Sequence, residues 1–129
     1  MVKFMASFTS ETYALLRVVA GFLLLWHGTQ KLFGFPGGFS ERPWHVTYVA
    51  GSIELVGGVL VMLGLFTRGA AFLCSGLMAS AYWMSHGTRA LLPIENRGEL
   101  AAVYCFVFLF ISAQGSGMCS LDRLRERAK

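Results

Sequence analysis

Charged side chains are scarce in this sequence. Asp, Glu, Lys and Arg make up 14% of its 129 residues, against about 25% in an ordinary soluble domain. Hydrophobic residues make up 55%, and the mean hydropathy is +0.57. This composition argues against a water-soluble domain and indicates a membrane protein.

Paired cysteines and metal-binding motifs are missing as well. The three cysteines, Cys74, Cys105 and Cys119, form no CxxC pair, which argues against both a disulfide framework and a zinc site. Cys74 and Cys105 lie in apolar runs and are expected to pack as small hydrophobic residues. Cys119 lies in the polar stretch GSGMCSLD and is the candidate reactive thiol. We expect no metal, because the histidines lack the i, i+4 ligand spacing, and no haem, flavin or iron–sulfur motif is present.

The basic residues do not form a nucleic-acid-binding stripe. The formal net charge is +4, but outside the C-terminal cluster the basic residues are scattered one or two at a time. The tail SLDRLRERAK is typical of a basic segment beside a membrane. We expect it to form a short amphipathic helix capped by Ser120 or Asp122, and we expect no nucleic-acid partner.

Four apolar segments approach the ~20 residues that cross ~30 Å of hydrocarbon. They cover residues 13–33, 46–66, 69–86 and 97–113, and the basic tail follows over residues 118–129. This pattern predicts one all-α domain over residues 1–129, a four-transmembrane-helix bundle with both termini on the same side. No small-residue cleavage site ends the first apolar segment, so we expect a retained helix and no signal peptide.

The distribution of Lys and Arg predicts the orientation. One face carries Lys3, Arg17, Arg68 and the basic tail, and the opposite face carries Lys31, Arg42, Arg89 and Arg97. The bias favours both termini in the cytoplasm, so Arg17 and Arg68 are interpreted as topology signals. Small residues in the first three segments are expected to let the helices approach closely: Gly21, Gly28, Gly51, Gly57, Gly58, Gly69, Gly76 and Ala79.

Glu54 is the residue least expected in a membrane span. It lies about eight residues from the end of its segment, which is roughly 12 Å deep at 1.5 Å per residue. An ionisable group at such a depth costs at least ~2.5 kcal/mol on insertion scales and needs a partner. On antiparallel helices His27 and Lys31 reach a similar depth, so we expect Glu54 to pair with one of them; a protonated Glu54 is the alternative.

Other polar residues converge on the same end of the bundle. Tyr82 and His86 share a face of the third segment, while Asn96 and Glu99 precede or open the fourth. We therefore predict a polar pocket in the outer half of the bundle. In this hypothesis Glu54, His27 and His86 handle protons, and Lys31, Tyr82, Asn96 and Glu99 bind the substrate. The alternative for Lys31, His86 and Glu99 is that they only anchor the span ends.

The chain resembles the DoxX family of small bacterial membrane proteins. The matching stretches are LLRVVAGFLLLWHGTQKLFG, GSIELVGGVLVMLGLFTRGAA, MSHG, ENRGELAAVY and GSGMCSLD, in the expected order over nearly the whole chain. The resemblance implies a four-helix, multi-pass protein of the bacterial inner membrane. Family relatives are linked to redox chemistry, as subunits of a thiosulfate:quinone oxidoreductase and as a membrane partner of enzymes that handle oxidants and thiols. The family pattern falls on Arg17, Gly28, Lys31, Glu54, Gly58, His86, Asn96, Glu99, Gly115 and Gly117.

Three functions remain open from the sequence. The first is a redox-linked membrane subunit that binds a quinone or a small thiol compound in the polar pocket and works with partner oxidoreductases. It would carry no covalently bound cofactor, and quinone is its candidate cofactor. The second is a non-enzymatic scaffold or assembly partner in which the Glu54 pairing fixes helix packing. The third is a small transporter component, which with four short helices would need a homo-oligomer.

Overall fold

The computed structural model describes residues 3–129 and is helical, with no strand in that range. Its elements are η1 (Lys3–Phe8), α1 (Thr9–Phe33), η2 (His45–Ala50), α2 (Gly51–Leu63), α3 (Thr67–Ala81), η3 (Tyr82–His86), α4 (Pro93–Asn96), α5 (Glu99–Gln114) and α6 (Leu121–Arg127). The wider π-helical turns of η2 and η3 run directly into α2 and out of α3, so each pair forms one continuous helix. The prediction of an all-α chain is confirmed.

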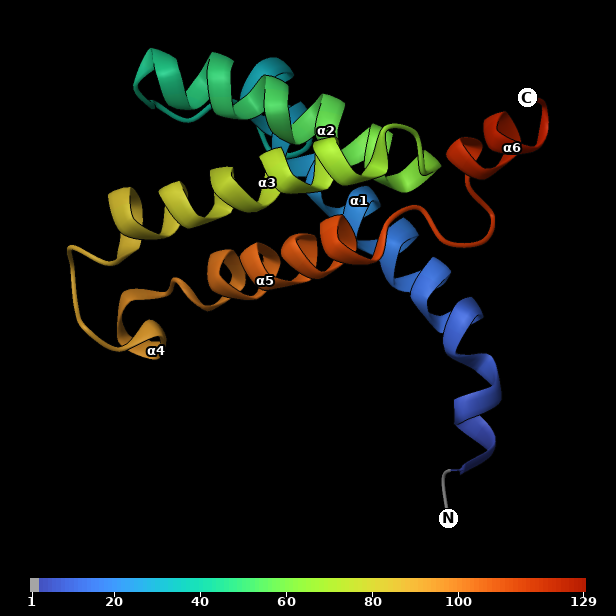
Figure 1. The fold of residues 1–129 in the computed structure, drawn as a ribbon. Helices are drawn as coiled ribbons and strands as arrows, with labels where there is room; N and C mark the ends of the chain where they lie inside the picture. Colours follow the sequence, from blue (N-terminus) through green and yellow to red (C-terminus); the bar gives the residue numbers. More distant parts are fainter. Residues whose placement is uncertain (1–2) are drawn as a thin grey trace.

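The long helices pack mainly on their neighbours. α1 packs most extensively on α2, α3 packs most extensively on α5, and α2 joins the two pairs through its contact with α3. Figure 1 shows α2, α3 and α5 lying side by side while α1 passes behind them, with its N-terminal part projecting away from the bundle. The turn between α2 and α3, the end of α5 and the tail helix α6 all lie at the same end of the bundle (Figure 1).

Glycines bring α1 and α2 into close contact. A Cβ atom added at Gly21 would lie 2.5 Å from the Gly58 carbonyl oxygen, and one added at Gly28 would lie 2.7 Å from the Gly51 carbonyl oxygen. The predicted role of these four glycines in helix contact is confirmed.

Two glycines of α3 behave differently. An added Cβ at Gly69 or at Gly76 meets no atom within 4 Å. The prediction that they mediate helix contacts is therefore wrong, because both lie on the exposed side of α3.

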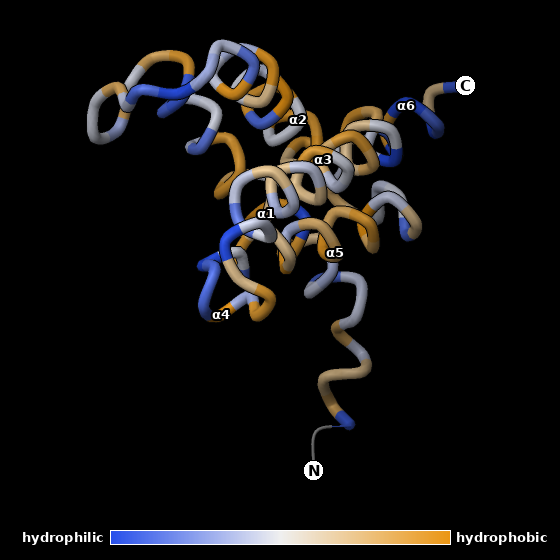
Figure 2. Tube along the Cα trace, turned by 90° about the vertical axis from the view of Figure 1, so that its left-hand side faces the viewer, coloured by the Kyte–Doolittle hydropathy of each residue, from blue (hydrophilic) through white to orange (hydrophobic). Residues whose placement is uncertain are grey.

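Much of the apolar surface faces outward. Lys3–Phe33 and His45–Leu63 are long and apolar enough to cross a membrane, and Glu99–Gln114 is a shorter apolar helix. Phe72 on α3 and Phe106 on α5 are 66% and 69% exposed. Figure 2 shows hydrophobic residues along the long helices, while hydrophilic residues gather in the connections and in α6. Apolar exposure on this scale suits helices in contact with lipid or another protein.

Arg17 fastens the C-terminal segment to the bundle. Its side chain is fully buried and donates hydrogen bonds to the carbonyl oxygens of Val61 at 2.7 Å, Met62 at 2.9 Å and Cys119 at 2.8 Å. A longer bond of 3.4 Å reaches the Met118 carbonyl. Interpreting Arg17 as a topology signal alone therefore missed its packing role, since the guanidinium satisfies the last carbonyls of α2 and those of the following loop.

Asp122 fixes α6 against the turn between α2 and α3. Its carboxylate accepts hydrogen bonds from the backbone amides of Phe66 and Thr67, each at 2.9 Å, and from the Thr67 hydroxyl at 2.8 Å. It thus satisfies the free amides at the start of α3, the role of an N-cap supplied from another helix. Ser120 caps α6 itself, accepting a 3.4 Å hydrogen bond from the Arg123 amide.

Candidate functional site

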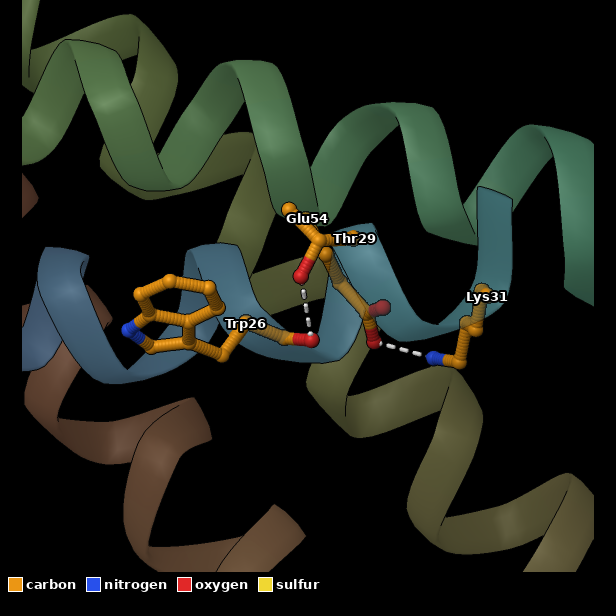
Figure 3. Close-up of polar contacts among 4 residues, drawn as sticks. All are labelled: Trp26, Thr29, Lys31 and Glu54. Carbon is orange, nitrogen blue, oxygen red and sulfur yellow. Dashed lines mark hydrogen bonds and ion pairs between the residues drawn. The ribbon is translucent and has the colours of Figure 1, made fainter. Parts of the chain in front are cut away.

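Lys31 on α1 and Glu54 on α2 form a buried ion pair. Their side chains, 16% and 4% exposed, point toward one another across the contact between the two helices (Figure 3). It is the one ion pair among residues 3–129. Pairing offsets part of the cost of removing both charges from water. The pairing predicted for Glu54 is confirmed, with Lys31 rather than His27 as its partner.

The second carboxylate oxygen of Glu54 has no hydrogen-bond partner among the described residues. This atom, Oε2, is buried. The neighbouring Thr29 donates its hydroxyl proton to the Trp26 carbonyl of its own helix, at 3.0 Å (Figure 3), so it does not serve Glu54. An unsatisfied buried acceptor costs about 1–3 kcal/mol. A bound molecule that donates a hydrogen bond to Oε2 would therefore remove this cost.

A cavity of about 160 Å³ lies beside this ion pair, between α1, α2, α3 and α5. Its polar lining consists of His27, Lys31, Glu54, His86 and Tyr104, and its apolar lining of Leu24, Met78, Ala81, Leu100 and Ala101. The cavity thus brings together four of the predicted site residues: His27 and Lys31 from α1, Glu54 from α2 and His86 from η3. The cavity combines an ammonium group, a carboxylate and two imidazoles with apolar walls.

Hydrogen bonding sets the orientation of His86. Its Nδ1 lies 3.0 Å from the carbonyl oxygen of Asn96, and because a carbonyl only accepts, Nδ1 carries the proton. In the neutral ring Nε2 is then the proton acceptor. The ring of His27 instead meets the ring of Tyr104 edge to face, with the centroids 6.4 Å apart.

The other predicted substrate-binding residues lie outside the cavity lining. Asn96 is buried, donates from Nδ2 to the Tyr82 hydroxyl at 3.2 Å and accepts from the Gly98 amide at 2.7 Å. Glu99 is exposed at the start of α5. Tyr82 and Asn96 thus order the segment whose carbonyl holds His86, and Glu99 takes no part in the cavity.

Comparison with known proteins shows which family the chain belongs to. The family model described as DoxX matches residues 12–87. The chain belongs to the DoxX family.

Two curated relatives of this DoxX protein are similar over most of their length. A Haemophilus influenzae protein named only as uncharacterized is 43% identical over 116 residues, which cover 84% of this chain and 87% of the relative. A Bacillus subtilis protein named "Putative oxidoreductase CatD" is 44% identical over 113 residues, covering 84% of this chain and 82% of the relative. No solved structure matches the chain significantly.

The match to the DoxX model includes every ionisable residue of the cavity except Tyr104. His27, Lys31, Glu54 and His86 all lie within residues 12–87. The family is membrane-associated, in agreement with the two helices long and apolar enough to cross a membrane. The shared part of this DoxX protein thus contains the ion pair and both histidines.

Tyr104 was missed by the sequence analysis. It is 7% exposed on α5 and stacks on Phe108, with the ring centroids 5.7 Å apart. The sequence does contain one signal: Tyr104 is the single Tyr or Trp in the otherwise apolar stretch 100–111, and a buried tyrosine hydroxyl requires a polar neighbour.

No metal-binding cluster forms among residues 3–129, where no three His, Cys, Asp or Glu side chains gather suitably. Cys119, the candidate thiol, is exposed beside α6 and does not line the cavity.

Proposed function

We propose that this DoxX protein is a four-span protein of the bacterial inner membrane, with both termini in the cytoplasm, whose cavity binds a quinone head group or a small thiol compound. It acts as a membrane subunit beside a partner oxidoreductase, which supplies the electron carrier. The observation that carries the proposal is the buried, unpartnered Oε2 of Glu54, a residue that lines the cavity.

The helix lengths support four spans. Beyond the two apolar helices Lys3–Phe33 and His45–Leu63, α3 and η3 form one continuous helix from Thr67 to His86, about 30 Å long at 1.5 Å per residue. α5 has 16 residues, about 24 Å, and its polar start lies beside the segment that holds His86.

The size of the cavity supports a ring-sized ligand. A cavity of about 150 Å³ in a protein core accommodates benzene, and the cavity here measures about 160 Å³. The walls from Leu24 and Met78 suit an apolar ring, and the Lys31 ammonium suits an oxygen substituent on it.

The polar lining supports proton handling. Quinones and thiols take up or release protons as their redox state changes. In this proposal the unpartnered Oε2 of Glu54 accepts a hydrogen bond from a protonated head group, and Nε2 of His86 accepts a proton. The name of the Bacillus subtilis relative, an oxidoreductase, supports a redox role.

A scaffold function is the second candidate. The buried Lys31–Glu54 pair ties α1 to α2 at their closest approach, and such pairs can specify how helices pack. In that case the pair matters for stability and the cavity has no ligand.

Ligand binding to the purified full-length protein in detergent separates the two candidates. A short-chain benzoquinone is one probe and free cysteine is the other, each measured by equilibrium dialysis. We expect the wild type to bind one of them, and Glu54→Gln and His86→Ala to weaken that binding roughly tenfold or more, because each removes a charge-assisted or proton-accepting contact. Glu95→Gln, at an exposed carboxylate outside the cavity, is the matched control and should bind as the wild type does.

Thermal unfolding of the same variants completes the test. If the wild type binds neither probe while Glu54→Gln lowers the unfolding temperature, the scaffold candidate is correct and the ligand proposal is wrong. If Glu95→Gln weakens binding as much as Glu54→Gln does, the cavity is not the binding site.

A further inference from the structure

A second hollow lies at the opposite end of the bundle from the ion pair, where α6 passes the end of α2. It has a volume of about 430 Å³, with Met62 and Leu63 of α2 on one side and Leu121, Arg123, Leu124 and Arg127 of α6 on the other. The cavity ligand proposed above has no part in this groove.

The groove has the two chemical halves of a lipid-binding site. Its apolar part includes Leu63 and Leu124, which are 44% and 59% exposed. Its polar part includes Arg123 and Arg127, which stand four residues apart on one face of α6 and are both exposed.

No acidic side chain lines this groove. Arg123 and Arg127 also form no ion pair within residues 3–129. A neighbouring hollow beside α6 includes Asp122 and Glu126 together with its basic residues, so it offers an anion a less favourable field. The lining of the groove between α2 and α6 therefore carries two positive charges and no negative one, although Arg123 also borders a hollow that includes Glu126.

Hydrogen bonds of Asp122 hold α6 at the end of α2. The Asp122 amide donates a 2.9 Å hydrogen bond to the Gly64 carbonyl, and the Asp122 carboxylate caps α3. Because α2 belongs to a membrane-length helix that ends at Leu63, these bonds place the two arginines directly beyond its apolar end. This is the height at which lipid phosphates lie above their acyl chains.

We propose that the groove between α2 and α6 binds one anionic phospholipid, with Arg123 and Arg127 on its phosphate and Leu63 and Leu124 against the start of its acyl chains. Guanidinium groups bind phosphate through paired hydrogen bonds, and basic recesses at the cytoplasmic ends of membrane helices suit anionic lipid head groups. The partner is a membrane lipid and not a free phosphate, because the apolar half of the groove is exposed without one.

Native mass spectrometry of the full-length protein in detergent tests this proposal. The probes are phosphatidylglycerol and, with the same acyl chains, phosphatidylcholine. We expect the wild type to retain one phosphatidylglycerol at concentrations where it retains no phosphatidylcholine. Arg127→Gln should weaken that retention about fivefold and Arg123→Gln/Arg127→Gln ~30-fold, since each basic side chain near a membrane surface contributes about 1 kcal/mol.

Lys129→Gln is the matched control, because it removes a positive charge from the same tail at a residue that does not line the groove. It should retain phosphatidylglycerol within about twofold of wild type, and inorganic phosphate should not displace the lipid. The proposal is overturned if the double variant retains phosphatidylglycerol as wild type does, if Lys129→Gln loses as much as Arg127→Gln, if phosphatidylcholine binds equally, or if inorganic phosphate displaces the lipid. Circular dichroism checks that the double variant keeps its helices. If the double variant loses them, retention of phosphatidylglycerol by the single variant Arg127→Gln decides the test.

Discussion

At the scale of single residues, the chain treats its buried charges in two different ways. Both terminal nitrogens of the Arg17 guanidinium donate to backbone carbonyls from two segments, while its buried Nε has no partner within the described residues. These bonds hold the C-terminal segment against α2, and Arg17 does not line the cavity beside Lys31. Glu54 has one oxygen on Lys31 and one without a partner. A buried charge whose hydrogen bonds hold two segments together is explained by packing, whereas a carboxylate with an unpartnered oxygen beside a cavity is a candidate for function.

Asp122 carries a pH-dependent prediction at this scale. Partial burial raises the pKa of its carboxyl, but hydrogen bonds from Thr67 and Phe66 outweigh that effect and lower the pKa below its ordinary value of 3.8. A lowered pKa means that the contribution to stability is complete above pH 4 and is lost as the pH falls through the folded-state pKa. We expect Asp122→Ala to cost about 1 kcal/mol at pH 6, as for other lost helix caps.

Thermal unfolding of wild type and Asp122→Ala in detergent, at pH values from 6 down to 3, measures this contribution. The difference between the two proteins should be a few degrees at pH 6 and should shrink below pH 4. A difference that stays constant over the whole range would show that the carboxylate form is not what stabilises the contact between α6 and α3.

At the scale of elements, the contact between α1 and α2 depends on the absence of side chains. A Cβ at Gly28 would overlap the backbone of Leu55 and lie 2.7 Å from the Gly51 carbonyl oxygen, and backbone atoms cannot rotate away as a side chain can. We expect Gly28→Ala to separate the two helices and to lower the unfolding temperature markedly, since overpacking typically costs about 1–3 kcal/mol. Gly76→Ala, where an added Cβ meets nothing within 4 Å, is the matched control and should be neutral or slightly stabilising, because alanine favours the helix.

These two variants also separate packing from helix propensity. The measurement is the unfolding temperature in one detergent at one pH. Equal effects of Gly28→Ala and Gly76→Ala would contradict the close approach of α1 and α2.

Helical periodicity explains both what the sequence predicts and where it fails. Residues on one stripe of each helix, combined with depth along the helix, reduce the expected partners of Glu54 to His27 and Lys31, and the structure has Lys31. The expected helix contact through Gly28 is confirmed too. The same reasoning fails for Gly76, because periodicity marks a stripe without saying which stripe another helix covers.

Helical periodicity also cannot predict contacts between segments that are far apart in the sequence. The bond from Arg17 to Cys119 spans 102 residues, and the bond from Thr67 to Asp122 spans 55. A cap supplied by another helix leaves no local pattern at the start of the helix that it caps, so Asp122 was considered only for its own helix. Tyr104 escaped because its stretch is otherwise apolar, and only the packing of α5 on α3 brings it to the cavity.

At the scale of the whole molecule, the two ends of the bundle differ in how tightly they are closed. At the α6 end hydrogen bonds from Arg17 and to Asp122 connect the tail to α2 and α3. At the other end the Lys31–Glu54 pair adjoins a cavity, and a hydrogen bond from His86 Nδ1 to the Asn96 carbonyl orients the His86 ring. This difference between the two ends agrees with the proposed function, in which the small molecule binds at the end that holds the cavity.

The proposed four-span arrangement predicts which thiols can be reached from each side of the membrane. Cys119 is exposed at the α6 end, while Cys74 is buried. With both termini in the cytoplasm, a membrane-impermeant maleimide should label Cys119 only after spheroplasts are lysed. Moving the accessible thiol to the loop between η3 and α4, as Cys119→Ser/Thr88→Cys, should give labelling in intact spheroplasts, because Thr88 is exposed at the opposite end of α3.

A second double variant tests whether the number of spans is even or odd. Cys119→Ser/Ser7→Cys places the thiol on η1, which is exposed near the N-terminus, and it should be labelled only on lysis, as Cys119 is. The variant Cys119→Ser alone gives the background from Cys74 and Cys105. If Ser7→Cys and Cys119 react from opposite sides, the number of spans is odd and the four-span proposal is wrong. If Thr88→Cys reacts from the same side as Cys119, then α5, the long helix between these two positions, does not cross the membrane, and the polar start of α5 lies on the same side as its C-terminal end.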